Sequence, residues 1–215
     1  MPANNTHYAI LVPGSDKLAF DKDREKAKFH NISVFELNLP SFAGHPVYDQ
    51  HAHFNIVTNL ILAAYDNIKS KYPAARVVAV GRNNGGGQLA WSLAHGFTPT
   101  AIVLVGAIPE ISRYRKESHA PSAKLFRQSL KGQEEFSRID EMIPLDITSS
   151  SNHWPNLTCL LQFGYDDPYI DETSVDAIKI LKKYYRVEWL KDDHKMESEP
   201  ALTQRWKFIK KQLDS

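Results

Sequence analysis

The stretch "VVAVGRNNGGGQLAWSLAHG" (residues 77–96) carries residues whose types and spacing could do chemistry. It reads as a buried strand, a glycine-rich corner and an amphipathic helix, with Gly81, Asn83 and Gly85 in the pattern Gly-x-Asn-x-Gly. A strand that turns directly into a helix needs small residues on either side of the corner. The corner residue needs a positive φ, which asparagine tolerates best among non-glycine residues. This is the shape of a nucleophile elbow, with Asn83 where a serine, cysteine or aspartate would attack.

An amide at this corner restricts the chemistry. Covalent acyl transfer needs a nucleophile that a neighbouring base can deprotonate. The amide nitrogen of Asn83 is delocalised and is not deprotonated by imidazole, so an ordinary acyl-enzyme is not expected. The helix that starts near Gly85 would still present its first N–H groups and its positive dipole end to an oxyanion.

Strands and helices alternate around this corner. Helical patterns cover 49–71 (Phe54, Val57, Leu60, Ile61, Ala64 and Ile68 on one stripe), 86–95, and a C-terminal segment with Ser198 as N-cap. The pattern predicts a doubly wound, mostly parallel α/β sheet of about six strands, which binds ligands at the carboxyl ends of its strands. Residues 110–156 break the alternation and are interpreted as a short helical cap over that edge. The expected strands are short apolar runs at 8–14, 32–40, 75–81, 100–109, 157–164 and 185–190.

Several segments together, in order, resemble the α/β-hydrolase superfamily over nearly the whole chain. "VAVGRNNGGG" is similar to that family's elbow, Gly-x-Ser-x-Gly-Gly, "LLQFGYDDPYID" to its acid-bearing strand end, and "EWLKDDHKM" to its histidine loop. "ILVPGS" resembles the first core strand with its oxyanion loop, and "FELNLPSFAGH" the strand and loop that follow. The resemblance implies a single α/β-hydrolase domain over residues 1–215.

The resemblance also assigns site residues. It places Asn83 at the nucleophile position, Asp167 at the acid and His194 at the base, with Asp166 as an alternative acid. It assigns the oxyanion hole to main-chain N–H groups at Asn84 and at Gly14 or Ser15. The sequence departs from the family at Asn83 and at Pro13, where many members carry histidine.

Three classes of function are compatible with these residues. The first is a hydrolase-like protein with a pocket for a small ester, thioester or other carbonyl compound, in which His194 and Asp167 act as a base pair. The second is a non-catalytic ligand-binding protein on the same fold. The third is a base-catalysed lyase or cofactor-free oxygenase without a covalent intermediate. Deamidation of Asn83 would restore an aspartate nucleophile, although Asn84, which precedes a glycine, is expected to deamidate first.

The composition excludes few classes of protein, but the net charge restricts the expected binding partners. The 215 residues carry a formal net charge of +1, which gives no electrostatic reason to expect nucleic acid or a membrane surface. The mixed-charge piece "KLAFDKDREKAK" is interpreted as solvated helix faces. Cys159 is the single cysteine and lies in an apolar run, so no intramolecular disulfide is possible and a buried thiol is expected.

The sequence also predicts the cellular location of the protein, its cofactors and its ligand. We find no pattern typical of a signal peptide or of a membrane span, and expect a cytoplasmic protein. His51 and His53 have a spacing that can bind zinc, but no third ligand follows, so no metal site and no cofactor are expected. The expected partner is a small carbonyl ligand or substrate; its identity and the oligomeric state stay open.

Overall fold

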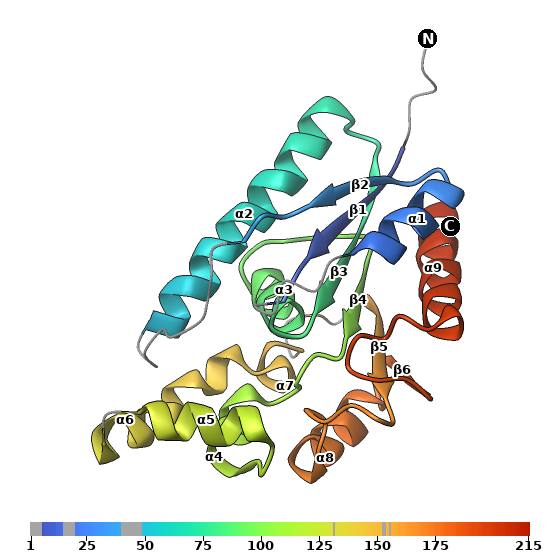
Figure 1. Cartoon of the computed structure of the whole chain (residues 1–215). Coiled ribbons are helices and arrows are strands. Elements are labelled where there is room, and N and C mark those ends of the chain that lie inside the picture. Colours follow the sequence, from blue (N-terminus) through green and yellow to red (C-terminus); the bar gives the residue numbers. More distant parts are fainter. Residues whose placement is uncertain (1–5, 15–19, 40–48, 131, 152–153, 155) are drawn as a thin grey trace.

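A computed structural model describes residues 6–14, 20–39, 49–130, 132–151, 154 and 156–215. Its six strands form one parallel sheet in the order β2-β1-β3-β4-β5-β6 (Figure 1). Adjacent strands are in parallel register throughout, for example Val12 beside Gly81 and Arg82 beside Val105. The predicted fold class, a doubly wound α/β sheet, is confirmed. The strands are β1 (His7–Val12), β2 (Ser33–Glu36), β3 (Arg76–Arg82), β4 (Ala101–Val105), β5 (Thr158–Gly164) and β6 (Arg186–Leu190).

Helices cover both faces of the sheet (Figure 1). The helices α1 (Asp21–Phe29) and α9 (Glu199–Asp214) pack on one face, and α2 (Asp49–Lys71), α3 (Asn84–Ala94) and α8 (Glu172–Leu181) pack on the other. A cluster of short helices connects β4 to β5 and lies beyond the carboxyl ends of the strands. It comprises α4 (Ile111–Glu117), α5 (Pro121–Ser129), α6 (Gln133–Ser137), the 3₁₀ helix η1 (Arg138–Leu145) and α7 (Ile147–Ser150).

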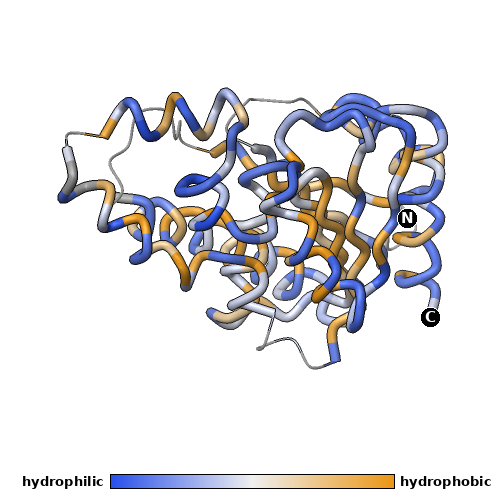
Figure 2. The backbone as a smooth tube through the Cα atoms, turned by 90° about the horizontal axis from the view of Figure 1, so that it is seen from below, coloured by the Kyte–Doolittle hydropathy of each residue, from blue (hydrophilic) through white to orange (hydrophobic). Residues whose placement is uncertain are grey.

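The core follows the two-residue period of the strands. In β4, Ile102 and Leu104 pack toward α2, α3 and α8, whereas Ala101, Val103 and Val105 pack toward α1 and α9. Both sets are fully or almost fully buried. Figure 2 shows the hydrophobic stretches concentrated in the strands at the centre and hydrophilic ones along the outer helices. Near-continuous apolar runs therefore form strands that are covered on both faces.

Two expectations about side chains are wrong. Leu60, placed on the apolar stripe of 49–71, is 37% exposed, because the buried face of α2 is narrower than the stripe. Asp23, placed on a solvated helix face, is fully buried in α1, where buried cations surround its carboxylate. Cys159 is buried, as predicted. No helix among the described residues is long and apolar enough to cross a membrane.

Candidate active site

The corner between β3 and α3 has the backbone that the sequence predicts. Asn83 has φ 48° and ψ −124°, and its N–H donates to the carbonyl of Val105 at the end of β4 (2.9 Å). Its own carbonyl accepts from Gly86 N–H (2.9 Å). Positive φ at a non-glycine residue costs free energy and persists only where the surrounding structure enforces it. Here two backbone hydrogen bonds hold the corner.

The glycines on either side of the corner are required by close packing. A Cβ at Gly81 would lie 2.7 Å from the carbonyl oxygen of Gly85, and a Cβ at Gly85 would lie 2.5 Å from the carbonyl oxygen of Pro13. Carbon and oxygen atoms do not pack at these distances without a backbone shift. The glycines of the Gly-x-Asn-x-Gly pattern are therefore required because β3, α3 and the end of β1 are in direct contact.

The histidine and one of the two candidate acids meet at the carboxyl end of the sheet. Asp167 follows β5 and His194 follows β6, and His194 Nδ1 lies 2.8 Å from Asp167 Oδ2. The Asp167 side chain is fully buried and that of His194 is 10% exposed. Asp166 is exposed, and its backbone N–H donates to the carbonyl of Asp192. The contact with His194 is therefore made by Asp167 and not by Asp166.

Two more glycines bring the histidine loop against the sheet. Gly106 directly follows β4 and has φ 56°, and a Cβ there would lie 3.3 Å from His194 Nδ1. A Cβ at Gly164, the last residue of β5, would lie 2.7 Å from the carbonyl oxygen of Asp193. The imidazole thus rests directly on the end of β4, the strand whose Val105 carbonyl bonds to the corner.

The structure describes two of the three candidate oxyanion-hole residues. Asn84 is the first residue of α3, with its backbone N–H at the positive end of the helix. Gly14 is buried and follows Pro13, whose carbonyl lies against Gly85. Ser15 lies outside the described residues.

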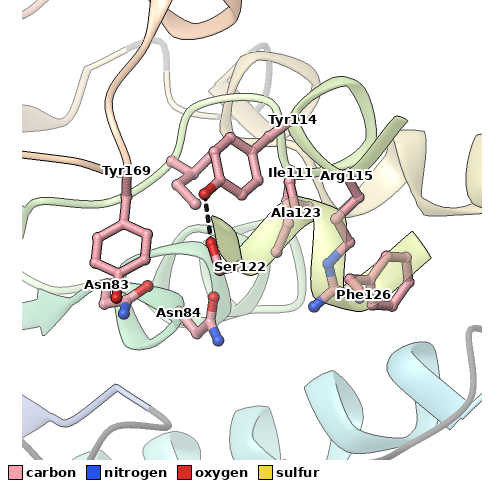
Figure 3. Close-up of a pocket in the computed structure, with 10 residues that line it drawn as sticks. Asn83, Asn84, Ile111, Tyr114, Arg115, Ser122, Ala123, Phe126 and Tyr169 are labelled. Carbon is pink, nitrogen blue, oxygen red and sulfur yellow. Dashed lines mark hydrogen bonds between the residues drawn. The ribbon is translucent and has the colours of Figure 1, made fainter. Parts of the chain in front are cut away.

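A cavity of about 230 Å³ opens beside the corner. Asn83 and Asn84 form one wall, and side chains from α4, α5 and the loop after β5 form the others (Figure 3). Tyr169 points toward Asn83 in this view. The lining residues are Asn83, Asn84, Ile108, Ile111, Tyr114, Arg115, Ser122, Ala123, Phe126 and Tyr169.

Tyr169 forms the wall of the cavity next to the histidine. Its ring centroid lies 4.4 Å from that of His194, and its backbone N–H donates to Asp167 Oδ1 (2.9 Å). Nε2 of His194 is buried. His194 is not among the residues that line the cavity, so a ligand there would meet Tyr169 before the imidazole.

Sequence comparisons find no match in any family model or among curated proteins. Solved structures do match, over nearly the whole chain. An esterase of Pyrococcus furiosus superposes with a TM-score of 0.67 at 12% identity, over 98% of this chain and 83% of its own. A fluorophosphonate-binding serine hydrolase of Staphylococcus aureus gives 0.66 at 14%, over 98% and 86%. The Francisella virulence factor BioJ gives 0.64 at 16%, over 98% and 78%.

The chain has the α/β-hydrolase fold. The resemblance stated from the motifs is thereby confirmed for the fold, and at these identities the likeness extends to nothing beyond the fold. Within this α/β-hydrolase fold, Asn83 occupies the strand-to-helix corner, and Asp167 and His194 follow the last two strands of the sheet.

Sequence reasoning missed Tyr169, Arg115, Tyr114 and Ser122 as cavity residues. Tyr169 lies two residues after Asp167, in a segment whose resemblance to the family points only to its acids. The other three lie in the mixed-charge connection between β4 and β5, where burial depends on how α4 and α5 fold back onto the sheet. No local pattern distinguishes these polar residues from solvated ones.

A buried ionic cluster lies on the face of the sheet that α1 and α9 cover, next to the corner. The Asp23 carboxylate accepts from Arg82 Nη2 (2.6 Å), Arg205 Nη1 (2.7 Å) and Trp206 Nε1 (2.8 Å). Burial alone would raise the pKa of Asp23, but the Arg205 and Arg82 guanidiniums hold it below its ordinary value. At neutral pH Asp23 is therefore a charged link between α1, β3 and α9.

The same arginines bind the histidine loop. Arg82, the residue before the corner, donates to Glu197 Oε1 (3.0 Å), and Arg205 donates to the carbonyl of Met196 (2.8 Å). Met196 lies two residues after His194 and has φ 51°. The corner and the histidine loop are thus connected through two guanidiniums.

The described residues contain no group of three or more His, Cys, Asp or Glu side chains that could hold a metal ion. His51 Nε2 instead lies 2.7 Å from the carbonyl of Glu141, and its ring packs edge-on against Trp91. The groups that the structure places near the corner are an imidazole–carboxylate pair, two amides and the amino end of α3.

Proposed function

We propose that this protein binds a small ester or thioester in the cavity beside Asn83 and hydrolyses it without a covalent intermediate. His194 would act as general base, Asp167 would orient it, and Asn84 would donate its N–H to the oxyanion. The observation that carries the proposal is the 2.8 Å contact between His194 Nδ1 and Asp167 Oδ2, buried at the same sheet edge as the corner. A carboxylate on Nδ1 fixes the tautomer in which Nε2 can accept a proton.

The reaction needs only water as co-reactant. His194 Nε2 would take a proton from water as the oxygen attacks the carbonyl carbon, giving a tetrahedral oxyanion and an imidazolium. Backbone donors at the corner would stabilise the oxyanion. The intermediate would then collapse, the C–O or C–S bond would break, and the imidazolium would return its proton to the leaving alkoxide or thiolate.

Asn83 has a different role in this proposal from that of a serine. Its amide cannot be activated by imidazole, but it can orient the carbonyl or the attacking water through a hydrogen bond. Enzymes that lose a triad member retain about 10³–10⁴-fold acceleration over water through the oxyanion hole and binding. We therefore expect slow turnover.

Three measurements test the proposal. Wild type is expected to hydrolyse p-nitrophenyl acetate slowly, without a burst, and to remain unlabelled by a fluorophosphonate probe. His194→Ala and Asp167→Asn are expected to lower kcat, the former by about 10²–10⁴-fold. Asp166→Asn is the matched control for Asp167→Asn and should leave kcat unchanged, because Asp166 is exposed and lies outside the contact with His194.

Asn83→Ser is the complementary variant. A hydroxyl at the corner would give His194 a nucleophile to activate, so this variant is expected to gain burst kinetics and fluorophosphonate labelling. Burst kinetics or labelling in wild type would contradict the non-covalent mechanism. Unchanged hydrolysis in His194→Ala would contradict the role of the base.

The position of Tyr169 favours a second candidate function, a ligand-binding protein without turnover. Its ring separates the cavity from the imidazole, and a base that never contacts the ligand would make the pocket a binding site only. Tyr169→Ala distinguishes the two functions. Under the hydrolytic proposal it should raise kcat by opening the path to His194, whereas a binding protein should hydrolyse no ester in either form.

A further inference from the structure

Arg115 places a buried cation in the wall of the cavity. It lies on α4, its residue is 9% exposed, and its side chain borders the cavity across from the asparagine corner (Figure 3). Desolvation lowers the pKa of Arg115 to about 10, so it keeps its charge at neutral pH. A charged guanidinium in the wall of a cavity can bind an anionic group of a ligand.

The guanidinium is held in a fixed orientation. Its Cζ lies over the Phe126 ring, 4.1 Å from the centroid, and its Nη1 lies 3.8 Å from Met142 Sδ. The backbone carbonyl of Arg115 accepts from Arg127 Nη1 (2.8 Å), which ties α4 to α5. The N–H donors of a guanidinium lie in its own plane, and two of them match the two oxygens of a carboxylate.

The remaining wall makes the cavity electrostatically one-sided. Among the described residues that line it, Arg115 is the only charged one, and the others are two amides, three hydroxyls and four apolar side chains. Tyr114 and Ser122, whose hydroxyls are 2.6 Å apart, lie beside Arg115. The amino end of α3 adds positive potential at the opposite wall. A ligand carrying one negative charge therefore complements this cavity better than a neutral one.

We propose that Arg115 binds a carboxylate, so that the cavity selects small carbonyl compounds with one anionic end, such as half-esters or half-thioesters of short dicarboxylic acids. The placement of the other end, with its carbonyl at Asn84, rests on the proposed function. The volume of about 230 Å³ limits the ligand to a few carbons, since sites for drug-sized ligands span roughly 300–1,000 Å³. One guanidinium matches one carboxylate in charge and shape, whereas a phosphate dianion would need further donors.

Calorimetric titration with two matched esters tests the proposal. Monomethyl succinate carries the carboxylate, and dimethyl succinate replaces it with a neutral ester of similar shape. Wild type is expected to bind the monoester at least about tenfold more tightly, the size of a charge-assisted hydrogen bond. Arg115→Met should abolish this preference, and Arg115→Lys, which keeps the charge but loses the planar fork, should restore part of it.

Lys116→Met is the control for loss of a positive charge. Lys116 is the next residue, lies outside the cavity and pairs with Asp140 on the surface, so the preference should stay as in wild type. Urea unfolding of each variant verifies that it is folded. Should Arg115→Met not fold, Arg115→Lys, which keeps the buried charge, is compared with wild type instead, and its preference for the monoester should be weaker than that of wild type.

Several results would overturn the proposal. These are failure of wild type to bind monomethyl succinate, equal affinity for the two esters, or a preference that survives Arg115→Met. Displacement of monomethyl succinate by inorganic phosphate more strongly than by succinate would assign the site to phosphate instead. Titrations in His194→Ala measure ligand binding in a variant that lacks the proposed base, and so separate this inference from the proposed function. Charge-selective binding without hydrolysis in wild type supports Arg115 and contradicts turnover, whereas hydrolysis without charge selection does the reverse.

Discussion

Gly85, Gly86 and Gly87 are consecutive residues in the first turn of α3, but a methyl group at each meets different surroundings. At Gly87 the added Cβ would lie 3.7 Å from Cζ of Phe54, an ordinary van der Waals distance. Alanine is favoured over glycine inside a helix by about 0.5–1 kcal/mol. Gly87→Ala is therefore expected to raise the free energy of unfolding by roughly that amount.

The same substitution one or two residues earlier should have the opposite sign. At Gly86 the Cβ would overlap the methyl group of Ala107, which is fully buried beyond β4. Overpacking typically costs about 1–3 kcal/mol, which exceeds the gain in helix propensity. At Gly85 the Cβ would lie 2.5 Å from the carbonyl oxygen of Pro13, so the backbone after β1 itself must move. We expect Gly85→Ala to cost about 3 kcal/mol or more.

Urea unfolding followed by circular dichroism measures all three variants under one set of conditions. Equal m-values would show that the differences are in stability and not in the denatured state. The double variant Gly86→Ala with Ala107→Gly removes the overlapping methyl and should recover part of the loss, as a double-mutant cycle. Destabilisation by Gly87→Ala, or stabilisation by Gly86→Ala, would refute the packing inferred at this corner.

Two carboxylates should show opposite dependences of stability on pH. Asp23→Asn leaves the Arg82 and Arg205 guanidiniums buried opposite a neutral amide and should cost about 3–5 kcal/mol in urea unfolding at pH 7; a loss below about 1 kcal/mol would contradict the network. Because the pKa of Asp23 is lowered, its contribution is present above pH 3.8 and is lost as pH falls through the folded value. Burial raises the pKa of Asp146, which accepts from Ser112, to about 6, so its protonated form is favoured in the fold. Relative to Asp146→Asn, wild type should therefore lose stability on the order of 3 kcal/mol between pH 4 and 7, and parallel pH profiles would contradict this.

The strands and the corner were predictable because their determinants are local. Runs such as "ARVVAVG" and "TAIVLVGAIP" are mostly apolar, and each contains a strand that is covered on both faces. Helix α2 has the predicted bounds of residues 49–71. Gly81 and Gly85 report a steric requirement that any strand-to-helix corner of this kind must meet. Local patterns therefore carried both the fold and the position of Asn83.

The rest depended on contacts between distant segments. Asp166 and Asp167 are equivalent in the sequence, and only the turn after β5 buries one of them against His194. Asp23 reads as one charge among many in α1, and its burial follows from the approach of Arg205, which is 182 residues away. Arg115 likewise has the local sequence of a solvated helix residue. Sequence patterns assign charged residues to the surface, so they do not predict which of these residues the fold buries.

The ionic cluster beneath the sheet bears directly on what the corner can do. Three buried charged groups are an expensive way to hold a fold, since apolar side chains of similar volume often stabilise as well or better. The cluster instead fixes the relative positions of these segments. Arg82 and Arg205 join Asp23 to Glu197 and to the Met196 carbonyl through hydrogen bonds of 2.6–3.0 Å. The histidine loop is thereby fixed relative to the residue before Asn83, by contacts that do not involve Asn83 itself. The base should therefore already lie in place when Asn83→Ser supplies a hydroxyl, and this is why a single substitution is expected to change the kinetics from slow, burst-free turnover to covalent catalysis.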